Sequence, residues 1–403
     1  MTSEIKQRIE QIRRGEVPEG YVKTALGLAP ANWKRYTFGD IYTERKEPGD
    51  ENLPLLMVSI HSGVSDGEVD AAELPKQVKR IEDKSQYKKA VSGDLVFNMM
   101  RAWQGAIGTV RTTGMVSPAY IVAEPNDKVY PLFMDYYSRT PQMINQIDRQ
   151  SYGVTDFRKR LYWDSFAPIS CTLPPIEEQQ KIAAILTTQD KVIELKEKRL
   201  AEKQRQKKYF MQQLLTGKKR LPGFIGKWKT FGFNEIFITI STKGHQINKA
   251  EYETKGRYPV IDQGRQMIAG YSNKAEKALM CPKEGVIVFG DHTREIKFVN
   301  FDFIVGADGT QLLSAKSKNA AIKYLFYYLS NKDIHSDGYS RHFKYVKEFT
   351  YRLPPLGEQT AIAEVLSAAD HEIDLLQQDI EQEKQKKKAL MQLLLTGIVR
   401  VKT

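Results

Sequence analysis

The sequence predicts a mixed α/β protein with an internal repeat, in which two α/β domains alternate with two long helices that pair as an antiparallel coiled coil. Three observations lead to this prediction. A 45-residue segment occurs twice, at 173–217 and 353–397. Both copies carry apolar residues at heptad spacing. Each copy follows a segment of roughly 130–150 residues with short strand-like runs broken by Gly, Pro and Asp.

The first element, residues 1–25, is a charged helical segment. Its sequence lacks the apolar core of a signal peptide, and nothing in the chain approaches about 18 consecutive apolar residues. We therefore expect a soluble, cytoplasmic protein with no membrane partner. The stretch before Trp33 and the stretch before Trp228 share one order, in which a helix end is followed by a glycine, a segment with proline and then the tryptophan. Residues 1–25 are thus expected to supply a piece of long helix that would otherwise be missing if the repeated units are arranged in a circle.

Residues 26–172 are predicted to form the first α/β domain. The runs LPLLMVSI, GDLVFNMM and AYIVAE have the composition of strands and are separated by turn residues. The stretch YPLFMDYYSRTPQMINQI has the spacing of one amphipathic helix.

Residues 173–217 are predicted to form one long helix, the central one. Pro174 and Pro175 stand just before or within its first turn, where a missing N–H costs nothing. Glu177 and Glu178 place negative charge at the positive end of the helix, and Gly217 ends it. Roughly 40 residues at about 1.5 Å each make a rod of about 60 Å.

Residues 218–352 repeat the order of the first domain, and residues 353–403 repeat the helix. RYPVIDQG, EGVIVFGD and FDFIVGADGTQLL precede the helical stretch AAIKYLFYYLSNKDI. The two helix segments align without a gap, and 19 of their 45 positions are identical. Two diverged copies of one unit are therefore expected, each an α/β domain followed by a long helix.

Both long helices carry a narrow apolar seam, interrupted by Lys207 and Lys387. One such helix cannot hide its seam from water, so the simplest partner for each is the other copy. Two equivalent units related by a twofold axis would place them antiparallel. The alternative is that each helix packs only on its own domain. The predicted seam residues are Leu186, Ile193, Leu200, Leu214, Leu366, Ile373, Ile380 and Leu394.

The composition favours a polyanionic partner. The chain has 61 Lys and Arg against 49 Asp and Glu, a net charge of +12, and each phosphate that a cation neutralises releases counterions. An ordinary basic cytosolic protein is the alternative. The two cysteines, Cys171 and Cys281, exclude a disulfide framework and a zinc cluster, and the six histidines show no metal spacing.

Two α/β domains, each followed by a helix with the pattern LPP…EQ…IA…L that closes on LLTG, resemble the specificity subunit of Type I restriction–modification systems. The resemblance covers nearly the whole chain, and the doubled pattern is its most specific feature. It implies two target-recognition domains that each read one half of an asymmetric, bipartite site in double-stranded DNA. It also implies that the coiled coil fixes the spacing and docks two modification (methyltransferase) subunits, which restriction subunits then join.

A specificity subunit performs no chemistry, so the resemblance implies no catalytic residue, no metal and no cofactor on this chain. S-adenosylmethionine, ATP and Mg²⁺ are expected on partner subunits only, and the system as a whole defends the cell against foreign DNA. Arg, Lys, Asn and Gln are the side chains best suited to base edges and phosphates.

Candidate DNA-binding residues of the first domain lie on three segments that follow predicted strands or precede the long helix. For each one, a solvated loop or a core position is the alternative. They are Ser59, His61, Arg101, Trp103, Gln104, Tyr152, Arg158, Lys159 and Arg160.

Candidates of the second domain occupy corresponding places, and the stretch before its long helix is again basic and aromatic. They are Gln263, Arg265, Gln266, His292, Thr293, Arg294, Thr310, Gln311, Tyr339, Arg341, His342 and Lys344.

Two other functions compete with this one. A self-sufficient adenine methyltransferase would need an Asn/Asp-Pro-Pro-aromatic phrase, but the nearest approach is SPAY at Ser117–Tyr120, which lacks the acid or amide. No Walker-type loop is present either. A coiled-coil adaptor that bridges proteins without reading DNA remains open, as does a role of the charged runs on the rods as solvated faces or docking surface.

Overall fold

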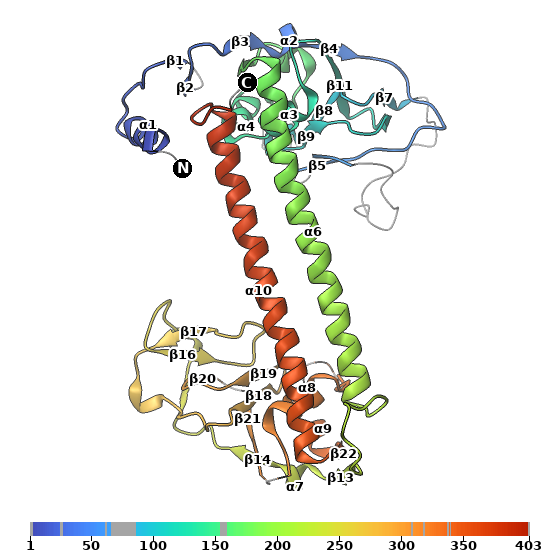
Figure 1. Cartoon of the computed structure of the whole chain (residues 1–403), viewed down its shortest axis with the longest axis vertical. Helices are drawn as coiled ribbons and strands as arrows, with labels where there is room; N and C mark the ends of the chain where they lie inside the picture. The colour runs from blue at the N-terminus through green and yellow to red at the C-terminus, as the bar shows by residue number, and fades with distance from the viewer. Residues whose placement is uncertain are drawn as a thin grey trace. The chain divides into compact units, whose positions relative to one another are not determined.

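A computed structural model of the chain is shown in Figure 1. It describes residues 3–24, 27–60, 63–65, 86–153, 159–307, 309–316, 319–336, 338 and 340–401. The chain divides into two compact units, Met1–Leu195 with Ile380–Thr403, and Lys196–Asp379. Each of the two long helices, α6 (Ile176–Leu214) and α10 (Leu356–Leu395), therefore contributes one part to each unit.

The first unit is built on an antiparallel sheet in the order β4 (Tyr42–Arg45), β11 (Tyr120–Pro125), β8 (Leu95–Asn98) and β9 (Ile107–Thr109). The expected single helix over 130–147 is instead two helices, α3 (Pro131–Tyr137) and α4 (Pro141–Arg149). Pro141 disfavours helical backbone at Thr140, which caps α4 by accepting from the Met143 N–H. The other elements are α1 (Ser3–Arg13), β1 (Tyr21–Thr24), β2 (Gly27–Pro30), β3 (Lys34–Thr37), α2 (Phe38–Ile41), β5 (Val58–Ser59), β6 (Gly63–Val64), β7 (Lys88–Ala90), η2 (Ala102–Gln104), β10 (Gly114–Val116), α5 (Trp163–Phe166) and β12 (Ser170–Leu173).

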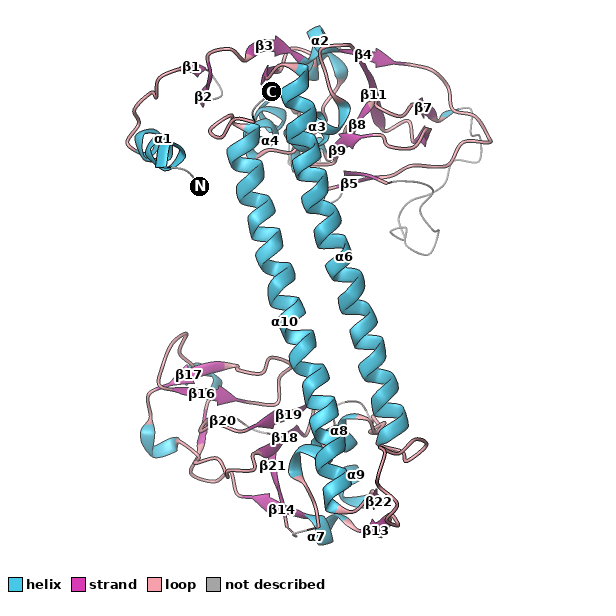
Figure 2. Ribbon diagram, in the orientation of Figure 1, coloured by secondary structure: helices cyan, strands magenta, loops and turns pink. Residues whose placement is uncertain are grey.

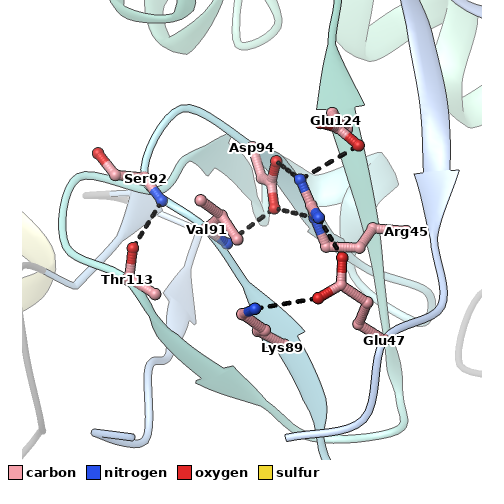
Figure 3. Close-up of polar contacts among 8 residues, drawn as sticks. All are labelled: Arg45, Glu47, Lys89, Val91, Ser92, Asp94, Thr113 and Glu124. Atoms are coloured by element: carbon pink, nitrogen blue, oxygen red, sulfur yellow. Dashed lines mark hydrogen bonds and ion pairs between the residues drawn. The ribbon is translucent and has the colours of Figure 1, made fainter.

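A polar cluster holds the β4 edge of this sheet (Figure 3). The Arg45 guanidinium donates to both oxygens of the buried Asp94 carboxylate, at 2.8 and 3.2 Å, and also pairs with Glu47 and Glu124. Burial raises the pKa of Asp94, against the opposing effect of Arg45. Because Asp94 also accepts from the Val91 N–H at 2.7 Å, the cluster ties β4 to the turn before β8.

The second unit has a sheet with the same strand order, β14 (Phe237–Ile240), β21 (Thr310–Ala315), β18 (Val286–Gly290) and β19 (Ile296–Val299). Helix α8 (Ile322–Ser330) is drawn at the lower part of α10 in Figure 2, and its Tyr327 hydroxyl donates to Asp370 of α10. Its buried face belongs to one apolar core with this sheet and both long helices. A further sheet has the order β15 (Gln246–Ile247), β20 (Ile304–Gly306), β16 (Tyr258–Ile261) and β17 (Gly270–Ser272). The remaining elements are β13 (Lys229–Phe231), α7 (Phe233–Ile236), η4 (Lys249–Glu251), η5 (Ala275–Lys277), α9 (Phe343–Glu348) and β22 (Tyr351–Leu353).

The predicted repeat and fold class are confirmed. Besides the shared sheet order, a two-stranded pair precedes each long helix, β12 with β3 in the first unit and β22 with β13 in the second. The short helices also correspond, α2 to α7 and α5 to α9.

The two long helices run antiparallel in both units. In the first unit Gln189 donates to the Glu383 carboxylate at 2.6 Å. In the second, Lys196 pairs with Asp379 at 2.8 Å and Lys203 with Glu372 at 2.9 Å, so partner numbers fall as residue numbers rise. Of the predicted seam residues, Leu200 is half-buried and all the others are buried.

Lys207 and Lys387, the predicted interruptions of the seam, have equivalent partners. Lys387 pairs with Asp190 across the helices and lies 5.5 Å above the Tyr136 ring, whose hydroxyl donates to the same Asp190. Lys207, Asp370 and Tyr327 repeat this arrangement in the second unit. Each triad joins both long helices to a domain helix, which satisfies the polar groups and fixes the register.

The glutamine of the LPP…EQ motif ties each long helix to its own domain. Gln179 donates to the Pro174 and Lys128 carbonyls at 2.9 and 3.0 Å and accepts from the Tyr130 N–H at 2.8 Å. Gln359 makes the same three kinds of bond, with Pro354, Asn319 and Ala321.

The glutamate of the motif binds an arginine that follows the end of the other long helix. The fully buried Glu178 accepts two bonds of 2.7 Å from Arg400, and Glu358 accepts two from Arg220. Both arginines stand three residues beyond the closing glycine of LLTG. The two ends of the repeated segment thus meet as a bidentate ion pair in each unit.

The N-terminal segment contacts the end of α10. The Tyr21 hydroxyl donates to the Gly397 carbonyl at 2.6 Å, and Arg8 donates to the Ile398 carbonyl at 3.1 Å. Trp33 is buried beside Gly397, as Trp228 lies beside Gly217. No residue of α1 is buried, so this helix does not extend the apolar seam.

Within the described ranges, no helix is both long and apolar enough to cross a membrane. The same residues contain no cluster of His, Cys, Asp and Glu that could hold a metal. Cys171 and Cys281 are free thiols, and burial raises the pKa of Cys171 to about 12.

Candidate nucleic-acid interface

In the first unit, the hairpin loop between β8 and β9 carries Arg101, Trp103 and Gln104. Arg101 and Gln104 are exposed, and the half-buried Trp103 indole donates to the Met100 carbonyl at 3.0 Å while its ring packs on the core. Gly105 ends the η2 turn with φ at +105°, a backbone conformation that favours glycine. The loop therefore presents a cation and an amide beside an anchored indole.

The segment before α5 lies against this loop. The Leu161 N–H donates to the Met99 carbonyl at 2.8 Å. The Lys159 ammonium is 5.1 Å above the Trp103 ring and 2.8 Å from Asp148. Tyr152 and Arg160 form an isolated bridge, and both side chains are exposed.

The predicted segment around Ser59 also lies against the β8–β9 hairpin loop. The Ile60 carbonyl, next to Ser59, lies 3.3 Å from where a Cβ on Gly105 would be. Ser59 is half-buried at the end of β5. The predicted residues His61 and Arg158 lie outside the described part of the chain.

In the second unit, the equivalent hairpin loop joins β18 to β19 and carries His292, Thr293 and Arg294. The His292 N–H donates to the Gln263 side-chain oxygen at 3.2 Å, and the Thr293 hydroxyl donates to the Gln263 carbonyl. His292 Nδ1 lies 3.2 Å from the Ser340 carbonyl. The loops around Gln263, His292 and Ser340 therefore meet, as the three loops of the first unit do.

Two predicted contact residues of the second unit are buried. His342 is 1% exposed, with Nδ1 2.8 Å from the Asp291 carbonyl, and the Asp291 carboxylate accepts from the Phe343 N–H at 2.8 Å. Thr310 is 3% exposed opposite Gly290 in the sheet. Both side chains are too buried to contact a ligand at the surface of the unit.

The remaining predicted residues of this unit are accessible, and Tyr339 lies outside the described part. The Arg265 side chain is 91% exposed, 3.5 Å from Glu295. Gln266, Arg341 and Lys344 are exposed as well, with Gln311 half-buried on β21.

Sequence reasoning missed Lys297, which supports the loop around Gln263. Its buried ammonium donates to the Asp262 carbonyl at 2.8 Å and to the Gln266 carbonyl. Burial lowers the pKa of Lys297, opposed mainly by the Asp262 carboxylate 3.8 Å away. A lysine inside the alternating strand IKFV was the available signal, because a charge at a buried strand position needs a partner.

The described residues therefore give each unit one candidate interface, formed by the hairpin loop between β8 and β9 or β18 and β19 and by the segment before the short helix α5 or α9. The family model for the type I restriction modification DNA specificity domain matches residues 72–204 and 225–385, and each match spans one of these interfaces. The chain belongs to this family.

Two relatives are specificity subunits of type I restriction enzymes from Methanocaldococcus jannaschii. The protein named as the MjaX subunit is 25% identical over 96% of this chain and 98% of its own length. The MjaVIII subunit is 23% identical over 79% of this chain and 83% of its own. Because the relatives are specificity subunits, the prediction that this chain is a non-catalytic specificity subunit is confirmed.

Solved structures share the fold. The S subunit of a type I restriction–modification system from M. genitalium has a TM-score of 0.61 at 13% identity, over 92% of this chain and 97% of its own. A chain from a study of type I complex assembly has a TM-score of 0.54 at 18% identity, over 92% and 99%.

Proposed function

We propose that this specificity subunit reads a bipartite, asymmetric site in double-stranded DNA, one half with each of the domains 26–172 and 218–352. The observation that carries the proposal is the recurrence of the same loop cluster at the same place in both sheets, with different side chains. Trp103 and Gln104 stand on one hairpin loop where His292 and Thr293 stand on the other. Equivalent scaffolds with different contact residues are what two half-site readers require.

The paired helices are proposed to fix the distance between the half-sites and to dock two modification subunits, which restriction subunits join in the cytoplasm. Leu195 on α6 and Leu375 on α10 support two equivalent docking places. They occupy the same position in the repeat, and they are 65% and 51% exposed although both are leucines on a coiled coil. S-adenosylmethionine, ATP and Mg²⁺ would then belong to the partners.

Binding of the purified chain to a random-sequence duplex at several salt concentrations tests the DNA proposal. Several phosphate contacts should give a log–log slope of about −4 or steeper. A flat response would favour the bridging adaptor. Sequencing of methylated adenines in cells that express the system should then reveal a two-part site.

Variants Leu195→Asp and Leu375→Asp test the docking proposal. Each should lower the number of bound modification subunits from two to one by native mass spectrometry, while DNA binding by the isolated chain stays unchanged. Full occupancy in the double variant would contradict it.

A further inference from the structure

A polar groove lies beside the reading loop of the second unit. It consists of two adjoining hollows, of ≈ 390 and ≈ 490 Å³, that share Ser330, Lys332 and Asp333 at the end of α8. Residues 293–296, from the β18–β19 loop and the start of β19, border one hollow, and α6, with Lys208, borders the other. The groove therefore continues from a predicted DNA-reading loop onto a long helix.

The basic run of α6, residues 196–208, has two faces, and the cations of one face are already neutralised by acidic residues of α10. Lys196, Arg199, Lys203 and Lys207 follow each other at spacings of three and four and pair with acidic residues of α10. Lys208 is rotated about 100° from Lys207 and is exposed toward the groove. Lys208 therefore lies on a different face of α6 from the cations that pair with α10, and it faces the groove.

Three cations on the groove keep their charge uncompensated. Among the described residues, Lys208, Lys332 and Arg294 take part in no ion pair. Arg294 donates to the neutral Ile334 carbonyl at 2.9 Å. The Lys332 ammonium is 4.9 Å above the Tyr328 ring, which restrains it without cancelling its charge.

The acidic residues of the groove do not balance these cations. Glu295 is engaged by Arg265 at 3.5 Å, which leaves Asp333 as the acidic residue without an ion pair among those described that line the groove. A surface with this excess of positive charge attracts phosphates.

We propose that Lys208, Lys332 and Arg294 form a phosphate-binding track, which carries the DNA backbone from the reading loop of the second unit onto α6. The proposal rests on the proposed function and extends it from Arg294, on the reading loop, to Lys208 and Lys332, which lie outside the recognition loops. Phosphate contacts of this kind hold the duplex in register and carry no sequence information.

The double variant Lys208→Gln/Lys332→Gln of the full chain tests the track. Its affinity should fall by the same factor for a random-sequence duplex and for a duplex with the methylated site found in cells. The log–log salt slope should become shallower by about 1.8, since each lost phosphate contact removes about 0.9. The control Lys255→Gln/Lys283→Gln removes the same charge from exposed positions of the same unit outside the groove, and should change the slope by less than half as much.

Three outcomes would overturn the proposal. Equal effects of both double variants would show that the loss reflects the net positive charge of the protein and no specific contact in the groove. A loss confined to the duplex with the methylated site would indicate base reading. Unchanged DNA binding with lost association of modification subunits would assign the groove to a protein partner. If the unaltered chain itself bound DNA without salt dependence, the proposed function would fail together with the track.

Discussion

Among single residues, Arg294 stands out by its backbone. Its φ of +63° is the one left-handed value among the described non-glycine residues, at a cost of about 1–2 kcal/mol for an L-residue. The hairpin loop retains an arginine where glycine would be free of strain. Strain of this kind concentrates at functional positions, which agrees with a contact between the Arg294 side chain and DNA.

The variant Arg294→Gly separates folding from contact. It removes the guanidinium while relieving the backbone, so the melting temperature should stay the same or rise. DNA affinity should fall by about 10- to 150-fold for any duplex sequence, because a hydrogen bond to a charged group such as a phosphate contributes about 1.5–3 kcal/mol. Thermal unfolding and equilibrium binding measure the two effects, with Lys283→Gln as the control for loss of one charge. Unchanged affinity would assign the left-handed backbone to loop geometry alone.

Among the elements, the paired helices depend on buried seam residues. Leu186 in the first unit is fully buried in the core formed by the sheet and both helices, whereas Leu195 on the same helix is 65% exposed. Heptad spacing marks Leu186 as a seam residue, and Leu195 falls outside the seam.

Leu186→Ala should lower the free energy of unfolding by about 2–5 kcal/mol, since it leaves a cavity in a closed core. Leu195→Ala, the matched control, should change it by no more than about 0.5 kcal/mol. Chemical denaturation measures both variants. Similar losses would mean that the seam is not packed as described.

The end of α10 is held by a pair that the helix pattern does not reveal. Glu178 is fully buried, and the Arg400 side chain is 33% exposed. Arg400→Gln leaves the carboxylate buried without its cation. Because solvent reaches part of the arginine, we expect a loss of about 2 kcal/mol, below the cost for a fully buried pair. Glu178→Gln/Arg400→Gln should recover part of this loss in the same unfolding assay; a double variant less stable than Arg400→Gln would contradict the pairing.

At the scale of the whole molecule, the repeat predicts that the two proposed half-site readers act independently. Each unit has its own sheet, apolar core and loop cluster. Exchange of residues 218–352 for the equivalent domain of another specificity subunit should change one half of the methylated site and leave the other half intact. Adenine methylation sequencing reads both halves at once. A change in both halves would show that the domains do not read independently.

The candidate site was predictable from the sequence only in outline. Strands followed by polar loops led to Arg101, Gln104, Thr293 and Arg294, which the structure places on equivalent exposed hairpins. The same reasoning included His342, which is buried, and missed Lys297, whose ammonium holds the loop around Gln263 by donating to the Asp262 and Gln266 carbonyls. Local composition indicates that a loop is polar, but which side chains face solvent depends on segments that pack against it from elsewhere in the chain.

By itself, the sequence determined the repeat, the two long helices and the seam, because periodicity and helix-end signals act over a few turns of one segment. Only the tertiary structure decided the partners of the charged residues in that pattern. Glu178 reads as a helix-end charge until Arg400, 222 residues away, closes on it. Lys207 reads as a flaw in the seam until Asp370 and Tyr327 meet it. A buried charge is stable only beside its counter-charge, and only the folded chain brings such distant residues together.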